Sequence, residues 1–228
     1  MADLPILFSA SMVRAILREI EKPGTGKTQT RRVLDAWCDE PPAFVDDGVI
    51  TAYDENDSPY RWPNTKAVGD RLYVREAWRT ESRAYDDLSP SAMGGEETIL
   101  FEADADWKLN KSVGRLRQGM HMPRWASRIT LTVTDVRVQR LQAINDADAI
   151  AEGLEHDMDG DVDGVGRHIV IESWRAADFL PWNRDPIEAY ADLWDQLNSA
   201  RGYGWDANPW VAAYTFRPIF ANIDQVQP

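Results

Sequence analysis

The chain has 228 residues, and a hydrophobic content of 43% is enough for a substantial core. Its 38 Asp and Glu outnumber 25 Lys and Arg, and one cysteine excludes an internal disulfide framework. No run approaches 18 apolar residues, and the apolar N-terminus has no basic region before it. We therefore expect a cytoplasmic protein with neither a membrane span nor a signal peptide.

The formal net charge of −13 is concentrated in two segments. Residues 40–60 carry −6 and residues 144–163 carry −8, and neither segment contains a Lys or Arg. Residues 108–140, in contrast, carry +7. Because the body outside the two acidic segments is nearly neutral, the net charge does not exclude a nucleotide partner. It disfavours tight, non-specific binding to long polyanions. We expect the acidic segments to shield a cleft.

The N-terminal part of the chain predicts a helix followed by a cationic strand or turn. Residues 9–21 have helical apolar spacing, and Ser9 or Ser11 is a suitable N-cap. Glycine and proline end this helix before the polar segment 27–34. Residues 35–66 are acidic and contain prolines, which predicts an irregular insertion.

Strand patterns dominate the middle of the chain. Residues 71–78 alternate apolar and polar positions after a turn signal, and residues 98–102 form a shorter candidate strand. Residues 127–141 form the clearest strand. Its apolar alternation changes phase near Thr134 and Asp135, which predicts a β-bulge or a sharp bend.

The C-terminal part predicts two helices and a final strand. Residues 145–154 begin with a capping residue and reach a glycine stop, and residues 186–198 have strong helical spacing after a proline. Residues 156–168 indicate an acidic, glycine-rich loop, and residues 211–217 a strand. The element order predicts an α+β protein built on a small, mainly antiparallel β-barrel with flanking helices and acidic loop insertions.

Several tempting motifs fail on their spacing. The segment Gly24–Thr28 (GTGKT) resembles a phosphate loop, but the required earlier glycine is Glu21 and a helix precedes the segment. The acidic loop lacks the Gly and Glu of a calcium loop, because Val162 and His168 stand there. The histidines have no metal-type spacing. We therefore expect no metal and no cofactor. The histidines are His121, His156 and His168.

A more informative cluster is KTQTRR, residues 27–32. Lys27 and Thr30 are three residues apart, so they would share a face in a helix or tight turn but not in a regular strand. A lysine beside a hydroxyl can activate it, or act as a base when its own pKa is depressed. The alternative is that both residues decorate a loop.

This cluster belongs to a set of motifs that resembles the ASCH domain family of the PUA-like superfamily. The others are residues 69–76 (GDRLYVRE) and residues 149–153 (AIAEG). Phage and prophage members are the most similar, because they also carry segments like residues 121–128 (HMPRWASR) and residues 205–211 (WDANPWV). The resemblance covers most of the chain apart from the acidic stretches.

The resemblance implies a single PUA-like domain over residues 1–228, with insertions at 35–66 and 156–185. Small bacterial ASCH proteins include N4-acetylcytidine amidohydrolases, and other members are described as ribonucleases or presumed RNA binders. In the amidohydrolases, a Lys and a Thr of a K-T-x-T motif and a Glu from a later helix are catalytic. By motif position these residues are Lys27, Thr30 and Glu152 here.

Such a trio suits amide hydrolysis, which needs an activated nucleophile, stabilisation of an oxyanion and a proton for the leaving amine. Thr30 would attack or position a water, Lys27 would activate it or stabilise charge, and Glu152 would carry the proton. Further residues are predicted to bind the substrate. They are Arg31, Arg75, Glu76, Arg124 and Trp125.

Three functions therefore stand as hypotheses. The first is a metal-independent amidohydrolase that acts on an N-acylated nucleoside or base. The second is a non-catalytic module that binds RNA, DNA or a modified base through the arginines of residues 108–140 and a rim of tryptophans. The third is a ribonuclease that uses the same cleft. The sequence leaves the oligomeric state open.

Overall fold

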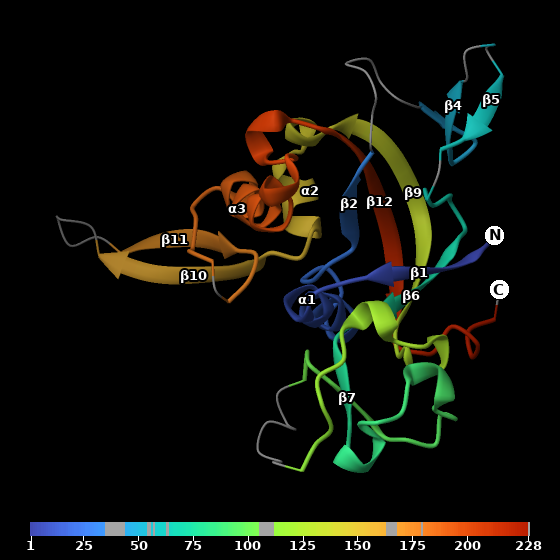
Figure 1. Cartoon of the computed structure of the whole chain (residues 1–228). Helices are drawn as coiled ribbons and strands as arrows, with labels where there is room; N and C mark the ends of the chain where they lie inside the picture. Colours follow the sequence, from blue (N-terminus) through green and yellow to red (C-terminus); the bar gives the residue numbers. More distant parts are fainter. Residues whose placement is uncertain are drawn as a thin grey trace.

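A curved five-stranded sheet forms the centre of the molecule (Figure 1). Its strand order is β1 (Asp3–Leu7), β6 (Arg71–Arg75), β9 (Thr130–Arg140), β12 (Trp210–Ile219) and β2 (Gln29–Val33). Strands β1 and β6 are parallel and the other pairs are antiparallel. The computed structural model describes residues 1–34, 44–53, 56, 58–62, 64–104, 112–162, 168–178 and 180–227.

The two edge strands of this sheet are β1 and β2, and no backbone pairing between them closes a barrel in the described part of the chain. A side chain links them instead: Arg32 of β2 donates from Nη2 to the carbonyl oxygen of Leu7 in β1 at 3.0 Å. The mixed α+β character expected from the sequence is therefore present, with the sheet curled so that its edges approach one another.

Strands β9 and β12 are the longest of the sheet, and their pairing contains the predicted bulge. Thr215 pairs with Asp135 and Phe216 pairs with Val133, so Thr134 is an extra residue on β9. An extra residue increases the local twist and bends the strand. The phase change in the sequence thus marks the place where the long pair curves around the core.

The three described α-helices match the predicted segments, and a side chain caps each of them. Helix α1 (Ala10–Glu21) begins at Ser9, α2 (Asp146–Ala151) at Asn145, and α3 (Pro186–Asn198) at Asp185. Helix α1 buries its apolar face in the main core beside the sheet, whereas α2 and α3 share a second apolar cluster. Short 3-10 turns lie at 83–85, 90–92, 119–121, 124–126, 141–143, 199–201 and 205–207.

The first acidic insertion is not an irregular loop where the structure describes it. Strands β3 (Phe44–Asp46), β4 (Val49–Tyr53) and β5 (Pro59–Arg61) form a small antiparallel sheet, whereas residues 35–43 lie outside the described part. The prediction for 35–66 is therefore wrong over these strands. The reason is that Ile50 and Ala52 alternate into the main core within an otherwise acidic stretch of sequence.

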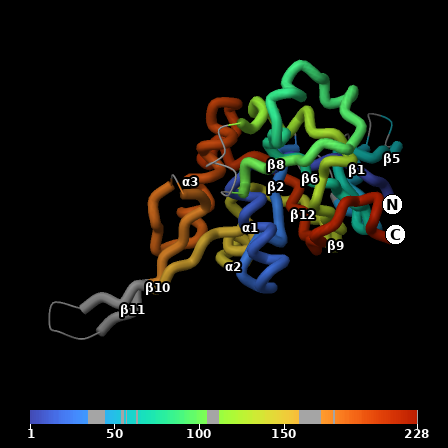
Figure 2. The backbone as a smooth tube through the Cα atoms, turned by 90° about the horizontal axis from the view of Figure 1, so that it is seen from below, coloured from blue at the N-terminus to red at the C-terminus, as the bar shows by residue number. Residues whose placement is uncertain are grey.

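The second acidic insertion is also misassigned as a loop. Strands β10 (Glu155–Val162) and β11 (His168–Arg175) pair as an antiparallel hairpin that projects from the body (Figures 1 and 2). Residues 156–158 of β10 are exposed, so this part of the strand lacks the apolar pattern of a buried strand. Another short pair joins β7 (Trp78–Thr80) to β8 (Ile99–Phe101). None of the described helices is both long and apolar enough to cross a membrane.

The turn between α1 and β2 packs directly against the helix that precedes it. The Glu19 carboxylate accepts hydrogen bonds from the backbone N–H groups of Gly24 and Gly26, each at 2.9 Å. The Lys27 N–H donates to the carbonyl oxygen of Ala15 at 2.9 Å. Amides of the segment that resembles a phosphate loop are therefore occupied by the chain's own carboxylate.

We expect Gly26→Ala to destabilise the fold strongly, because the new Cβ would overlap backbone atoms of Ala15 and Glu19 in α1. The cost should reach or exceed the ~1–3 kcal/mol typical of overpacking, measured as the free energy of unfolding in urea. Gly24→Ala is the matched control. Its Cβ would meet no atom within 4 Å, so only its positive φ of +84° costs stability, about 1 kcal/mol. Equal losses in both variants would contradict this packing.

Candidate functional site

The Glu152 carboxylate lies buried between two cations. Lys27 donates from Nζ to Glu152 Oε2 at 2.7 Å and to the Glu152 carbonyl oxygen at 2.6 Å. Arg31 donates from Nη1 to Glu152 Oε1 at 2.9 Å. The Lys27 and Arg31 side chains are fully buried, and that of Glu152 is 2% exposed. The structure thus brings together Lys27 and Glu152, two members of the predicted trio.

A second carboxylate, Asp148, extends this arrangement into a network. Arg31 donates from Nη2 to Asp148 at 2.8 Å, and Arg137 of β9 donates from both terminal nitrogens at 3.0 Å. Gln29 adds a bond at 3.1 Å. Burial alone would raise the pKa of Asp148, but hydrogen bonds from Arg137 and Gln29 outweigh it and lower that pKa. Asp148 therefore remains ionised and anchors the two arginines.

The end of α2 places Glu152 in this network. The chain reverses at Gly153, which has a φ of +98°. A Cβ at Gly153 would lie 2.8 Å from the Cβ atoms of both Ala15 and Lys27, so glycine permits the close approach. Arg18 of α1 then donates to the carbonyl oxygens of Gly153 and Leu154 at 3.0 and 2.9 Å, where a cation complements the helix end.

Burial changes the acid–base properties of Lys27. Removal of its ammonium from water lowers the pKa of Lys27, and the charge and hydrogen bond of Glu152 only partly oppose this change. A buried ammonium and a buried carboxylate would each be strongly unfavourable without the other. Lys27 and Glu152 therefore stabilise one another in the interior.

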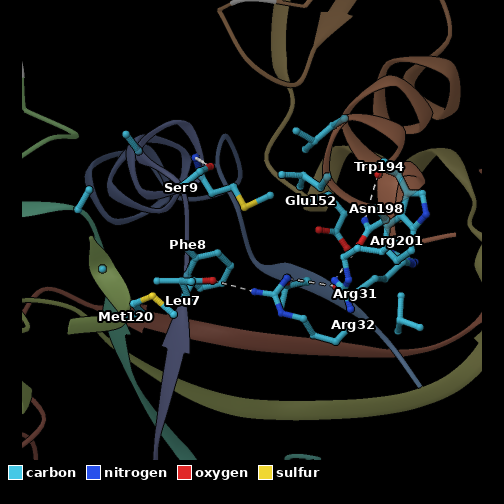
Figure 3. Close-up of a pocket in the computed structure, with 18 of the residues that line it drawn as sticks. Leu7, Phe8, Ser9, Arg31, Arg32, Met120, Glu152, Trp194, Asn198 and Arg201 are labelled. Carbon is cyan, nitrogen blue, oxygen red and sulfur yellow. Dashed lines mark hydrogen bonds and ion pairs between the residues drawn. The ribbon is translucent and has the colours of Figure 1, made fainter. Parts of the chain in front are cut away.

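A cavity of about 570 Å³ lies beside the network (Figure 3). Thr30, Arg31 and Glu152 line it, whereas Lys27 does not. Thr30 is 1% exposed, and its hydroxyl has no hydrogen bond to any described residue. A hydroxyl-bearing residue and a carboxylate-bearing residue therefore line the same cavity. Lys27 lies outside the lining and contacts Glu152.

Three aromatic side chains contribute to the remaining wall. Phe8, Tyr190 and Trp194 line the cavity, and each is buried. The Arg31 guanidinium lies 5.8 Å from the centre of the Tyr190 ring. Burial raises the pKa of Tyr190 well above its ordinary value, so its phenol remains neutral. A wall that combines aromatic rings with polar and charged side chains is suited to a small molecule that has both apolar and polar parts.

Two predicted substrate-binding residues lie near the cavity but outside its lining. Arg75 donates to the carbonyl oxygen of Met120, a lining residue, at 3.3 Å, and its guanidinium lies 5.4 Å from the Tyr73 ring centre. Glu76 is buried and paired with Arg128 at 3.0 Å. Burial raises the pKa of Glu76 against the effect of Arg128. These residues support the neighbouring backbone and core.

The other two, Arg124 and Trp125, lie outside the lining and have different partners. Arg124 forms ion pairs with Asp3 at 2.7 Å and Asp224 at 2.6 Å, and Trp125 packs beside the cluster around Trp78. The same holds for much of the basic segment 108–140, whose described Arg124, Arg128 and Arg137 are all paired with carboxylates. That segment therefore presents less free positive charge than its composition indicates.

Sequence reasoning missed Asp148 and Arg137. Asp148 stands four residues before Glu152, and this spacing places both carboxylates on one face of α2. That spacing was the available signal. The expectation that acidic segments shield the cleft is wrong for the described residues, since 40–60 contributes no lining residue and 144–163 contributes Glu152 alone.

No family model, curated protein or solved structure matches the chain. The ASCH resemblance therefore stays a prediction, and the site rests on its own geometry. Within the described ranges, no group of three or more His, Cys, Asp or Glu side chains is arranged to hold a metal ion.

We expect Glu152→Gln to destabilise the protein by about 3–5 kcal/mol, because the Lys27 ammonium loses its buried counter-charge. The double variant Lys27→Met/Glu152→Gln should lose less than the sum of the two single variants, as measured by urea unfolding. Arg14→Gln, which breaks an exposed pair with Asp178, should change stability by less than about 1 kcal/mol. Strictly additive losses at Lys27 and Glu152 would show that the pair is not coupled.

Proposed function

We propose that the protein is a hydrolase that cleaves the amide bond of an N-acylated nucleoside or base, with N4-acetylcytidine as the model substrate. The observation that carries this proposal is that Thr30 and Glu152 line one cavity while Lys27 holds Glu152 through two hydrogen bonds. These are the three residues that the ASCH resemblance assigns to catalysis. Their convergence supports the same chemistry.

The fold part of the proposal is a PUA-like barrel. It is supported by the curved order β1-β6-β9-β12-β2, the bulge opposite Thr215 and the approach of the two edge strands through Arg32 and Leu7. The helices α1 and α3 then contribute to the cavity with β2. In this arrangement the cavity opens at the junction between the sheet edges.

In the proposed reaction, the Thr30 oxygen adds to the acyl carbon and its proton passes to the Glu152 carboxylate. Arg31, which lines the cavity, offsets part of the negative charge that develops on the acyl oxygen. The C–N bond then breaks as Glu152 returns the proton to the leaving amine. Water attacks the acyl-threonine by the same route and releases the carboxylic acid. Lys27 is a positioning residue in this scheme.

A non-catalytic binding module is the second candidate, and one observation favours it. Both Glu152 carboxylate oxygens already accept hydrogen bonds from buried cations, as they would in a structural brace. The aromatic wall would then stack a modified base that is bound and released unchanged. The two candidates predict the same ligand class but differ in whether product forms.

The test is incubation with N4-acetylcytidine and separation of cytidine and acetate by chromatography. Thr30→Val should reduce turnover by at least ~10²-fold, because it removes the nucleophilic hydroxyl and keeps the side-chain volume. Thr28→Val is the matched control in the same motif, since Thr28 does not line the cavity, and it should retain activity.

Absence of turnover on every acylated nucleoside would reject the hydrolase. Binding of N4-acetylcytidine without product would favour the binding module instead. Equal activity in Thr30→Val and Thr28→Val would remove Thr30 from the mechanism while leaving the reaction itself established.

A further inference from the structure

The wall of the cavity carries an excess of positive charge. Its charged lining residues are Arg31, Arg32, Arg201 and Glu152. Arg31 is neutralised by the buried network, whereas Arg32 and Arg201 form no ion pair with any described carboxylate. The cavity of a protein with a net charge of −13 is therefore locally cationic.

A shortage of counter-charges does not explain these two arginines, because the chain has thirteen more carboxylates than Lys and Arg. Some arginines of the described part pair with carboxylates, such as Arg71 with Asp3 at 2.8 Å and Arg175 with Glu155 at 2.5 Å, whereas others, such as Arg217, have no ion pair with a described carboxylate. What distinguishes Arg32 and Arg201 is that both line one cavity, where a paired arginine would first have to break its ion pair to bind an anion.

Arg32 is held in place without being neutralised. Its guanidinium donates to the carbonyl oxygens of Leu7 at 3.0 Å and Arg31 at 3.3 Å, and lies 5.2 Å from the Phe8 ring centre. A guanidinium has five N–H donors, so several remain after these two bonds. Neutral carbonyls and a ring orient the group, and no described carboxylate forms a direct ion pair with it.

Arg201 approaches the same cavity from the turn that follows α3, so the two arginines come from β2 and from the end of α3 (Figure 3). Arg201 is exposed, and its contacts are the Asn198 side-chain oxygen at 3.5 Å and the Tyr203 ring at 5.7 Å. Two guanidinium groups from separate elements can together bind a tetrahedral anion, for which arginine provides planar, bidentate donors.

We propose that Arg32 and Arg201 bind the phosphate of a nucleotide whose base lies against the aromatic wall. This inference rests on the proposed function for the nature of the base and deepens it: the substrate is an N-acylated nucleoside monophosphate and not a neutral nucleoside. A volume of about 570 Å³ suits one nucleotide. A free mononucleotide is favoured over a nucleic-acid strand, because the net charge of −13 repels long polyanions.

The experiment uses unmodified ligands, so that binding is measured without any reaction. Isothermal titration of the full chain should show that cytidine 5′-monophosphate binds at least ~10-fold more tightly than cytidine, as expected for charge-assisted hydrogen bonds. Arg201→Gln and Arg32→Gln should each weaken nucleotide binding by ~10-fold and leave cytidine binding unchanged. Because Arg201 is exposed, its replacement also keeps the test valid if Arg32→Gln fails to fold.

Arg217→Gln is the matched control, since it removes one exposed arginine that does not line the cavity. It should leave nucleotide affinity unchanged. Equal affinities for cytidine and its monophosphate, the same loss in Arg217→Gln and Arg201→Gln, or no binding of either ligand would overturn the phosphate site.

Two further arms separate the remaining possibilities. A cytidine trinucleotide that binds ~10-fold more tightly than the mononucleotide would overturn the assignment to a free nucleotide. Nucleotide binding without deacetylation of any acylated substrate would reject the hydrolase and support the phosphate site. Deacetylation with no preference for the monophosphate would support the hydrolase and overturn the phosphate site.

Discussion

The contact on which the site depends is the buried ion pair between Lys27 and Glu152, at 2.7 Å. Neither group tolerates burial without the other, so the pair compels the start of β2 and the end of α2 to meet. A second ion pair, between Arg31 of β2 and Asp148 of α2, holds the same two elements together. Cations and carboxylates alternate in this network, so a small displacement of α2 would separate several ion pairs at once. This network makes a rigid base for the cavity above it.

The cavity combines a neutralised interior with an unneutralised rim. In the interior, Arg31 and Glu152 are paired with one another and with neighbouring charged groups, and Thr30 lines the cavity beside them. At the rim, Arg32 and Arg201 have only neutral contacts within the described part. In the proposed function, this contrast separates a reactive end from an anion-binding end, and a ligand with one acyl group and one phosphate would take a defined orientation.

Local patterns predicted the helices, the long strands and the bulge at Thr134, because capping and apolar periodicity depend only on near neighbours. They failed over 44–61 and 155–175. There, acidic composition concealed strands that pack one face or stand in solvent. The role of Asp148 was equally hidden. In the sequence, Asp148 is one of many acidic residues in the segment 144–163. In the fold, its carboxylate forms ion pairs with Arg31 and Arg137.

The amino-acid sequence alone was sufficient for where helices begin and end and for which residue types are available for catalysis. The meeting of Lys27 with Glu152, 125 residues apart, was suggested by resemblance and established only by the tertiary structure. The presence of both Arg32 and Arg201 in the lining of one cavity was not predicted from the sequence. The physical reason is that the position of a charged residue in the sequence does not determine which oppositely charged residue it will pair with. Which carboxylate neutralises which cation is decided by strand register and helix packing, and those same contacts decide which cations remain free for a ligand.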